Sequence, residues 1–235
     1  METSIINKIR KRTDRFVESQ LLKIGRVLDV RVWETGNIIE VDLHLPMANI
    51  NRWTRVPFIK FRVSELCFQD YTPFGWDDET STCSILIDTS DSSAGRRWAN
   101  SLRTGDQIYY LKIEFQAQPP HLTDMVVGLG DASSLGYLLA LQYLTLPGSR
   151  FDGAVLLNSP GAGQLFKDYF DSPVTILTNY NEMAGWLMTE GFCTTHTSFY
   201  LSGNHGLVKP LHKVLKTLGH TKVQISDSGF NSSKF

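Results

Sequence analysis

Cysteine is scarce in this chain of 235 residues, and the three present (Cys67, Cys83 and Cys193) are far apart in the sequence. They are too few and too scattered for a disulfide framework or a zinc site, so we expect no metal site and free thiols in a cytoplasmic protein. An excess of charge of one sign is also missing. The 23 Lys and Arg residues are matched by 24 Asp and Glu residues, which leaves no overall positive field for a nucleic-acid partner.

Long hydrophobic runs are absent as well. No apolar stretch reaches the roughly 18 residues needed to span a bilayer, and the N-terminus lacks a secretory apolar segment, so we expect no stable membrane insertion. Residues 1–21 form a basic segment with apolar residues at helical spacing. This pattern favours a helix packed on the body of the protein over an arm that binds a membrane surface or a polyanion.

Residues 22–117 have the pattern of a β-domain. Apolar and polar residues alternate over about six segments, and the first two flank a Thr35-Gly36-Asn37 turn that is typical of a hairpin. One short helix is expected at residues 93–102. Six antiparallel strands without a long helix predict a small closed barrel.

After a proline-containing connector at residues 116–121, the pattern changes to alternating β and α segments. Apolar, β-branched strands alternate with helices up to about residue 226. Such alternation predicts a doubly wound parallel sheet. We therefore expect residues 118–235 to form a nucleotide-binding-like α/β domain, with a ligand cleft between it and the barrel.

The first turn of this α/β domain is rich in glycine and in helix-capping residues, namely Gly128, Gly130, Asp131 and Ser133. Glycine allows close approach to a phosphate, and a helix N-terminus attracts an anion. The spacing is not a clean Gly-x-Gly-x-x-Gly, so an ordinary tight turn is the alternative. The next strand ends in Leu157-Asn158-Ser159, which leaves NADH and NADPH equally open.

Two features of the barrel suit a flavin. Tyr71 and Thr72 end one strand, and a helix begins near Ser93 after the next strand. A ring and a hydroxyl at a barrel rim are able to stack on and hydrogen-bond a flavin, while the helix start receives its pyrophosphate. The alternative is a rim aromatic and a capped helix with no ligand.

The order of barrel, connector and doubly wound domain resembles the siderophore-interacting proteins, which are FAD-dependent ferric-siderophore reductases of the ferredoxin-reductase-like superfamily. The motifs that carry the resemblance are Gln69-Asp70-Tyr71-Thr72-Pro73, Ser92-Ser93-Ala94-Gly95-Arg96-Arg97-Trp98-Ala99, Arg103-Thr104-Gly105-Asp106 and Gly203-Asn204-His205-Gly206. The resemblance covers about residues 22–230. It implies FAD, NADH or NADPH as cofactors and a ferric siderophore as substrate, and it leaves the oligomeric state open.

The resemblance also implies roles for single residues. Thr72 would be the catalytic residue, hydrogen-bonded near the flavin N5, with Tyr71 packed on the isoalloxazine ring. The helix start would hold the pyrophosphate, and the glycine-rich turn would hold the nicotinamide nucleotide. The residues implied in cofactor binding are Gln69, Tyr71, Thr72, Ser93, Ala94, Gly95, Arg96, Trp98, Gly128, Gly130, Asp131, Ser133 and Phe230.

Some positions depart from the family pattern. Gln69 stands where the family has an arginine for the flavin phosphates, and a neutral amide lacks the charge that strengthens such contacts. Asp88 lies where the family has a histidine-glycine pair and would repel a phosphate. Candidates to replace the lost charge are Lys60, Arg62, Arg96 and Arg97.

The departures motivate a second hypothesis, in which the chain is a non-catalytic or weakly flavin-binding module of the same fold that binds a siderophore or a nucleotide. A third, a reductase that serves a ferredoxin or an oxygenase, requires a basic docking patch.

Overall fold

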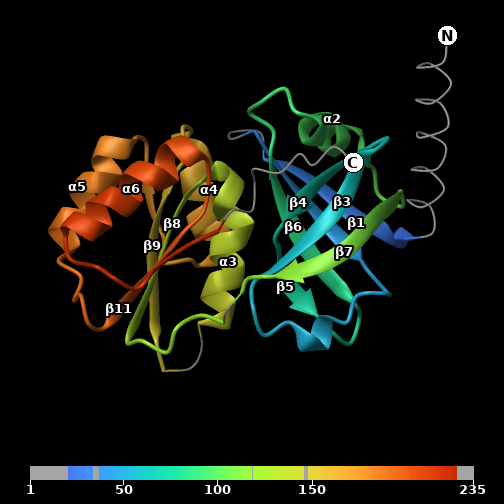
Figure 1. The fold of residues 1–235 in the computed structure, drawn as a ribbon. Coiled ribbons are helices and arrows are strands. Elements are labelled where there is room, and N and C mark those ends of the chain that lie inside the picture. The colour runs from blue at the N-terminus through green and yellow to red at the C-terminus, as the bar shows by residue number, and fades with distance from the viewer. Residues whose placement is uncertain (1–20, 34–36, 118, 146–147, 227–235) are drawn as a thin grey trace, which may run out of the picture.

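The fold is that of a computed structural model, in which residues 21–33, 37–117, 119–145 and 148–226 are described. Two halves lie side by side, a β-sheet half in blue to green and an α/β half in yellow to red (Figure 1). The predicted N-terminal helix and Phe230 lie outside the described residues. All three cysteines are free thiols, as predicted.

The first half is an antiparallel sheet of seven strands in the order β4-β3-β7-β1-β2-β6-β5. The strands are β1 (Lys23–Trp33), β2 (Ile38–His44), β3 (Pro57–Ser64), β4 (Cys67–Tyr71), β5 (Pro73–Asp77), β6 (Thr82–Asp88) and β7 (Gln107–Phe115). A 3-10 turn, η1 (Ile50–Arg52), follows β2, and helix α2 (Ala94–Ser101) lies between β6 and β7. The expected hairpin is formed by β1 and β2, in which Trp33 pairs with Ile38.

The sequence predicted about six strands, and the structure has seven because the apolar segment before residue 75 is divided at Thr72. Strand β4 pairs with β3, whereas β5 pairs with β6. These two strands lie at opposite edges of the sheet, although Thr72 alone separates them. A one-residue connection between the two edges requires the sheet to curl until they meet, which confirms the predicted barrel.

The second half is a parallel sheet in the order β10-β9-β8-β11-β12, which confirms the predicted doubly wound architecture. Its strands are β8 (Met125–Asp131), β9 (Arg150–Leu156), β10 (Thr175–Leu177), β11 (Thr197–Leu201) and β12 (Val223–Ile225). Its helical segments are η2 (Ala132–Ser134), α3 (Leu135–Leu144), α4 (Pro160–Phe170), α5 (Tyr180–Glu190) and α6 (His205–Thr217). Within the described ranges, no helix is long and apolar enough to cross a membrane.

Helix α3 joins the two halves. It packs against β5 (Figure 1), and one hydrophobic core contains residues of the barrel and of the α/β half, including Phe74 and Leu86 together with Leu135 and Leu138. At the centre of this contact, the Cα of Gly136 lies against the carbonyl oxygen of Thr72. This contact between α3 and β5 forms the seam between the two halves. It places the bend between β4 and β5 beside the turn that follows β8, the first strand of the parallel sheet.

The connector after β7 is held by side-chain hydrogen bonds. Nε2 of Gln116 donates to Oη of Tyr137 at 3.2 Å and to Oε1 of Gln224 at 2.9 Å. The backbone N–H of His121 donates to Oη of Tyr200 at 2.6 Å. These bonds tie the connector to α3, β11 and β12, and so help to set the position of one half relative to the other.

Candidate functional site

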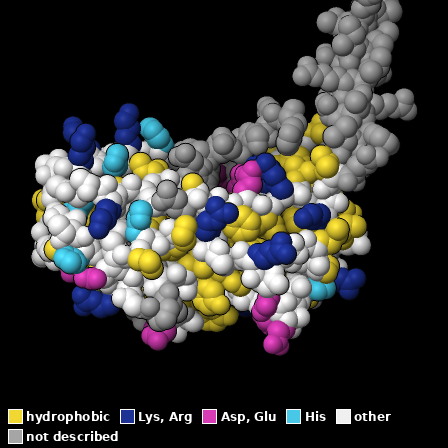
Figure 2. Space-filling model, turned by 60° about the horizontal axis from the view of Figure 1, so that its bottom comes forward, with side chains coloured by type: hydrophobic (Ala, Val, Ile, Leu, Met, Phe, Trp, Pro, Cys, Tyr) yellow, Lys and Arg dark blue, Asp and Glu magenta, His cyan; other side chains and the backbone are white. Residues whose placement is uncertain are grey.

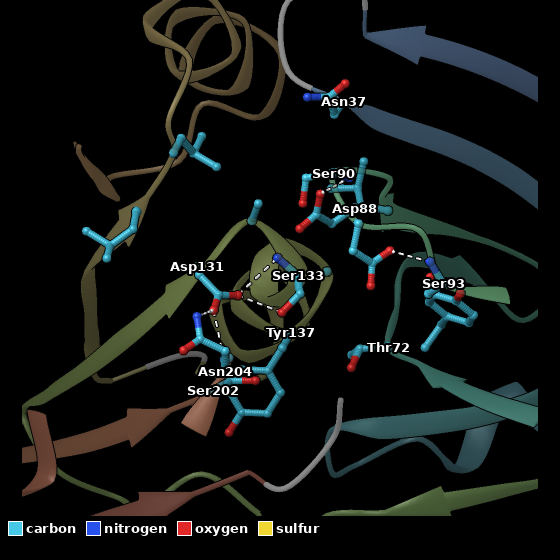
Figure 3. A pocket seen from close by; sticks show the side chains of 18 of the residues that line it. Asn37, Thr72, Asp88, Ser90, Ser93, Asp131, Ser133, Tyr137, Ser202 and Asn204 are labelled. Atoms are coloured by element: carbon cyan, nitrogen blue, oxygen red, sulfur yellow. Dashed lines mark hydrogen bonds between the residues drawn. The ribbon is translucent and has the colours of Figure 1, made fainter. Parts of the chain in front are cut away.

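A cavity of about 920 Å³ lies between the two halves. One wall comes from the bend between β4 and β5, the end of β6 and the start of α2, and the other wall comes from the carboxyl ends of β8, β9 and β11. Figure 3 shows Asp88, Ser90 and Ser93 on one side and Asp131, Ser133 and Asn204 on the other. Ligands of open α/β sheets bind outside the carboxyl ends of the strands, so this cavity is the candidate site.

The cavity brings together many, but not all, of the residues singled out from the sequence. The predicted residues that line it are Gln69, Tyr71, Thr72, Ser93, Ala94, Asp131 and Ser133. Those placed outside the lining are Gly95, Arg96, Trp98, Gly128 and Gly130. Gly128 and Gly130 are buried within β8, where Leu138 and Ser134 of the following helical segments pack closely on their Cα atoms. Packing, and not access to a ligand, explains these two glycines.

Tyr71 lies in an aromatic cluster beneath α2. Its ring is stacked on Trp98 with a centroid separation of 5.8 Å, and its hydroxyl donates to Oε1 of Gln69 at 2.7 Å. The two polar groups pack so tightly on Gly95 that a Cβ at that position would have no room. Burial raises the pKa of the Tyr71 hydroxyl, and the charge of Asp91 acts in the same direction, so this group stays protonated at neutral pH.

Thr72 lies where the two halves of the protein meet at the cavity. Thr72 lines the cavity, and its backbone carbonyl oxygen packs against the first turn of α3. A Cβ on Gly136 would lie only 2.6 Å from this oxygen. Backbone cannot move aside as a flexible side chain does. The glycine in the first turn of α3 therefore permits the close seam that sets the position of Thr72.

The N-terminus of α2 points its first turn at the cavity. Oγ of Ser93 accepts from the N–H of Arg96 at 3.2 Å, and Oδ1 of Asp91 accepts from the N–H of Ser93 at 3.0 Å. The N–H groups of Ala94 and Gly95 have no acceptor within the helix, as is general for the first turn. Of these two residues only Ala94 lines the cavity, so its N–H is the backbone donor that this end of the helix offers to a ligand there.

The charge of the cavity is negative. Asp70, Asp88, Asp91 and Asp131 line it, and its described lining contains no lysine or arginine. The mostly buried ammonium of Lys60 is paired with Asp70 at 2.8 Å. An anion in this cavity would therefore meet the carboxylates of Asp88, Asp91 and Asp131, which have no lysine or arginine beside them in the described lining.

The other three residues that were candidates to replace the missing positive charge, Arg62, Arg96 and Arg97, lie outside the cavity lining. Nη1 of Arg96 donates to the carbonyl of Asp91 at 3.0 Å, and Nη1 of Arg97 donates to the carbonyl of Ser92 at 2.7 Å. The guanidinium of Arg62 lies over the ring of Tyr109. On the face shown in Figure 2, described Lys and Arg side chains are scattered and do not form one basic patch.

Asp131 occupies the crevice at which the strand order of the parallel sheet reverses, between β8 and β11. Its carboxylate accepts from the N–H and Oγ of Ser133 at 3.1 and 2.6 Å, and from the N–H and Nδ2 of Asn204 at 2.8 and 2.7 Å (Figure 3). Gly203, with φ of +124°, brings the chain against this carboxylate. The backbone N–H groups that a bound phosphate would need at this turn are already bonded to the protein's own anion.

Several lining residues were not among the site residues that the sequence predicted. Asn158, Ser159 and Ser202 follow the ends of β9 and β11, and Tyr137 projects from α3. The signal for the first three was available, because the carboxyl ends of all strands in a parallel sheet meet at one edge. Tyr137 carried no such signal, since it reads as an ordinary core residue of a helix.

Several solved structures share the fold of this chain at low sequence identity. No protein-family model matches the chain, and no curated protein sequence matches it. The siderophore-interacting protein of Acinetobacter baumannii superimposes with a TM-score of 0.70 at 13% identity, over 91% of this chain and 93% of that chain. That of Aeromonas hydrophila gives a TM-score of 0.63 at 14% identity, over 88% and 87%. A ferredoxin NADP+ reductase of Neisseria gonorrhoeae, with bound FAD and NADP, gives 0.67 at 13%, over 88% and 98%.

The chain has the ferredoxin-reductase-like fold. At these identities the likeness concerns the fold, and at that level it confirms the resemblance to siderophore-interacting proteins. In the part of the chain that the structure describes, no group of three or more His, Cys, Asp and Glu side chains is arranged to hold a metal ion.

Proposed function

We propose that this protein is a flavin-dependent oxidoreductase that uses NADH or NADPH to reduce a ferric siderophore. The observation that carries the proposal is the cavity itself, in which the Tyr71–Thr72 bend of the barrel faces the carboxyl edge of the parallel sheet. The bound FAD and NADP of the Neisseria reductase, which has the same fold, support this choice of cofactors. A bound flavin would accept a hydride from NAD(P)H and release its electrons singly.

The chain's own residues fit the flavin ring. The Tyr71 side chain is held in place by Trp98 and Gln69, which removes the entropy cost of ordering it when a ligand binds. The Thr72 hydroxyl makes no hydrogen bond to any described residue, so it is free to bond to a ring nitrogen. At the other end of the site, the N–H group of Ala94, which lines the cavity, would donate to the pyrophosphate.

The overall reaction balances with two ferric ions for each nucleotide. NAD(P)H supplies two electrons and becomes NAD(P)+ with release of one proton, and two Fe(III) become two Fe(II). Ferrous iron binds the hard oxygen ligands of a siderophore more weakly than ferric iron does, so reduction releases the metal.

An absorption spectrum of the purified protein, taken after incubation with FAD and again after adding NADH or NADPH under nitrogen, tests this proposal. We expect flavin bands that shift on binding and bleach with one of the two nucleotides. Thr72→Val should slow the bleaching about tenfold because one hydrogen bond to the ring is lost, whereas Thr72→Ser should retain the rate. A protein that perturbs the spectrum of no flavin would refute the proposal.

The second candidate function is a binding module of the same fold without turnover. The carboxylate of Asp131, in the turn that was expected to hold a nucleotide phosphate, favours it, as does the lack of Lys and Arg in the described lining. Such a protein would bind a ferric siderophore and leave NADH and NADPH unoxidised in the presence of flavin.

A further inference from the structure

We infer that the cavity holds a flavin by its ring and not by its phosphates, so that riboflavin binds at least as tightly as FAD and the flavin exchanges freely. This inference rests on the proposed flavin-dependent function. It specifies the chemical class of the ligand, an uncharged flavin, and it treats the flavin as a dissociable ligand.

The ring end of the cavity is formed by Tyr71 and Thr72, and the carboxylate nearest in sequence, Asp70, is paired with the ammonium of Lys60. Tyr71 lines the cavity and packs against two rings behind it, with centroid separations of 5.8 Å to Trp98 and 6.2 Å to Phe61, which lie outside the lining. Thr72 lines the cavity beside it and offers a neutral hydroxyl. Stacking and neutral hydrogen bonds are interactions that every flavin offers equally, whatever is attached to its ribityl chain.

The phosphate end carries fixed carboxylates. Oδ1 of Asp88 accepts from the N–H of Ser90 at 2.9 Å, and Oδ1 of Asp91 accepts from the N–H of Ser93 at 3.0 Å. Asp88 ends β6 and Asp91 lies in the short loop that leads from β6 into α2, and both aspartates line the cavity. The segment that brings the helix N-terminus to a phosphate therefore brings two negative charges with it.

The described lining of the cavity contains no lysine or arginine that could contact a phosphate directly. Gln69 is neutral and accepts a hydrogen bond from Tyr71, and the ammonium of Lys60 is engaged by Asp70. The guanidinium groups of Arg96 and Arg97 donate to carbonyls of the same loop and lie outside the cavity lining. A pyrophosphate would thus meet a backbone N–H group and carboxylates together, and like-charge repulsion cancels the gain from the N–H group.

The dissociation constants of riboflavin, FMN and FAD, measured by flavin fluorescence on the full chain at low ionic strength and again at about 0.15 M salt, test the inference. We expect riboflavin to bind as tightly as FAD or more tightly at low salt. Salt should strengthen FAD binding, because it screens the repulsion between carboxylates and phosphates, and should leave riboflavin binding unchanged.

Two isosteric substitutions sharpen the test. Asp88→Asn and Asp91→Asn keep the oxygen that accepts the loop N–H and remove the charge, so each should tighten FAD binding by up to about fivefold without changing riboflavin binding. Asp77→Asn is the matched control. Oδ1 of Asp77 also accepts from an N–H two residues ahead, at 2.9 Å, but Asp77 lies outside the cavity lining, so neither affinity should change.

The failures are distinguishable. FAD binding about tenfold tighter than riboflavin at low salt, or FAD binding that weakens as salt is added, would overturn this inference and leave the proposed function intact. A protein that binds none of the three flavins would overturn the proposed function, and this inference with it.

Discussion

Gly136→Ala is the substitution that most directly tests the seam between the two halves. The residue lies in the first turn of α3, and a Cβ there would be 2.6 Å from the carbonyl oxygen of Thr72, whereas ordinary van der Waals contact begins at 3.4 Å. The obstructing atom belongs to the backbone of the β4–β5 bend. Either α3 or the bend must therefore move.

Two opposing effects determine the net change in stability. Replacing glycine by alanine in a helix stabilises by up to about 1 kcal/mol, because less backbone entropy is lost on folding. Forcing an extra methyl into a closely packed contact costs about 1–3 kcal/mol. Since the contact lies well inside the ordinary range and involves backbone, we expect the cost to exceed the gain, with a net loss of about 1–2 kcal/mol.

The chain provides a matched control in Gly185→Ala. Gly185 lies inside α5, and a Cβ there would meet nothing within 4 Å, so this variant should gain about 1 kcal/mol. Urea unfolding of the two variants and the wild type measures the difference, and flavin affinity reports on displacement of Thr72. If Gly136→Ala stabilised the protein as Gly185→Ala does, the close approach across the seam would be refuted.

Three further perturbations have defined outcomes. Arg31→Met should lower the free energy of unfolding by about 2 kcal/mol, because it removes the guanidinium that lies 2.8 Å from the buried carboxylate of Glu40 and offsets its charge. Equal urea midpoints would contradict this. Asp131→Ala should cost about 1–3 kcal/mol and weaken the tie between β8 and β11, seen as faster amide exchange at Asn204. Burial lowers the pKa of His220, so stability should be complete above pH of about 6.5 and fall as the pH falls below it, because the unfolded chain takes up the proton first. His220→Gln should flatten that fall, whereas His212→Gln, on the exposed face of α6, should retain it.

Sequence reasoning identified the two architectures because each rests on a local periodicity. Alternation of period two marked the barrel strands, and the βα alternation marked the parallel sheet. The sequence placed a strand end at Tyr71 and Thr72 but did not predict that a new strand, β5, begins at Pro73, because the apolar pattern continues there and only the pairing partner changes. A change of partner is a long-range property that no local pattern records.

The site was predicted in part, for the same reason. The sequence placed Tyr71 and Thr72 at the end of a strand and Ser93 at the start of a helix. All three residues line the cavity. Gly128 and Gly130 were expected at phosphates but lie buried in β8, because glycine serves close helix packing as well as close ligand approach.

The sequence by itself determined the order of elements, the balance of charge and the identity of the groups that the chain offers to a ligand. Only the tertiary structure decided which of these groups face one another. Asp88 and Asp91 lie across one cavity from Asp131. Lys60 forms an ion pair with Asp70 within the barrel, and the guanidinium of Arg96 donates to the carbonyl of Asp91. The physical reason is that charge acts through space, so the field in a cavity depends on distances that the sheets set and the sequence does not state.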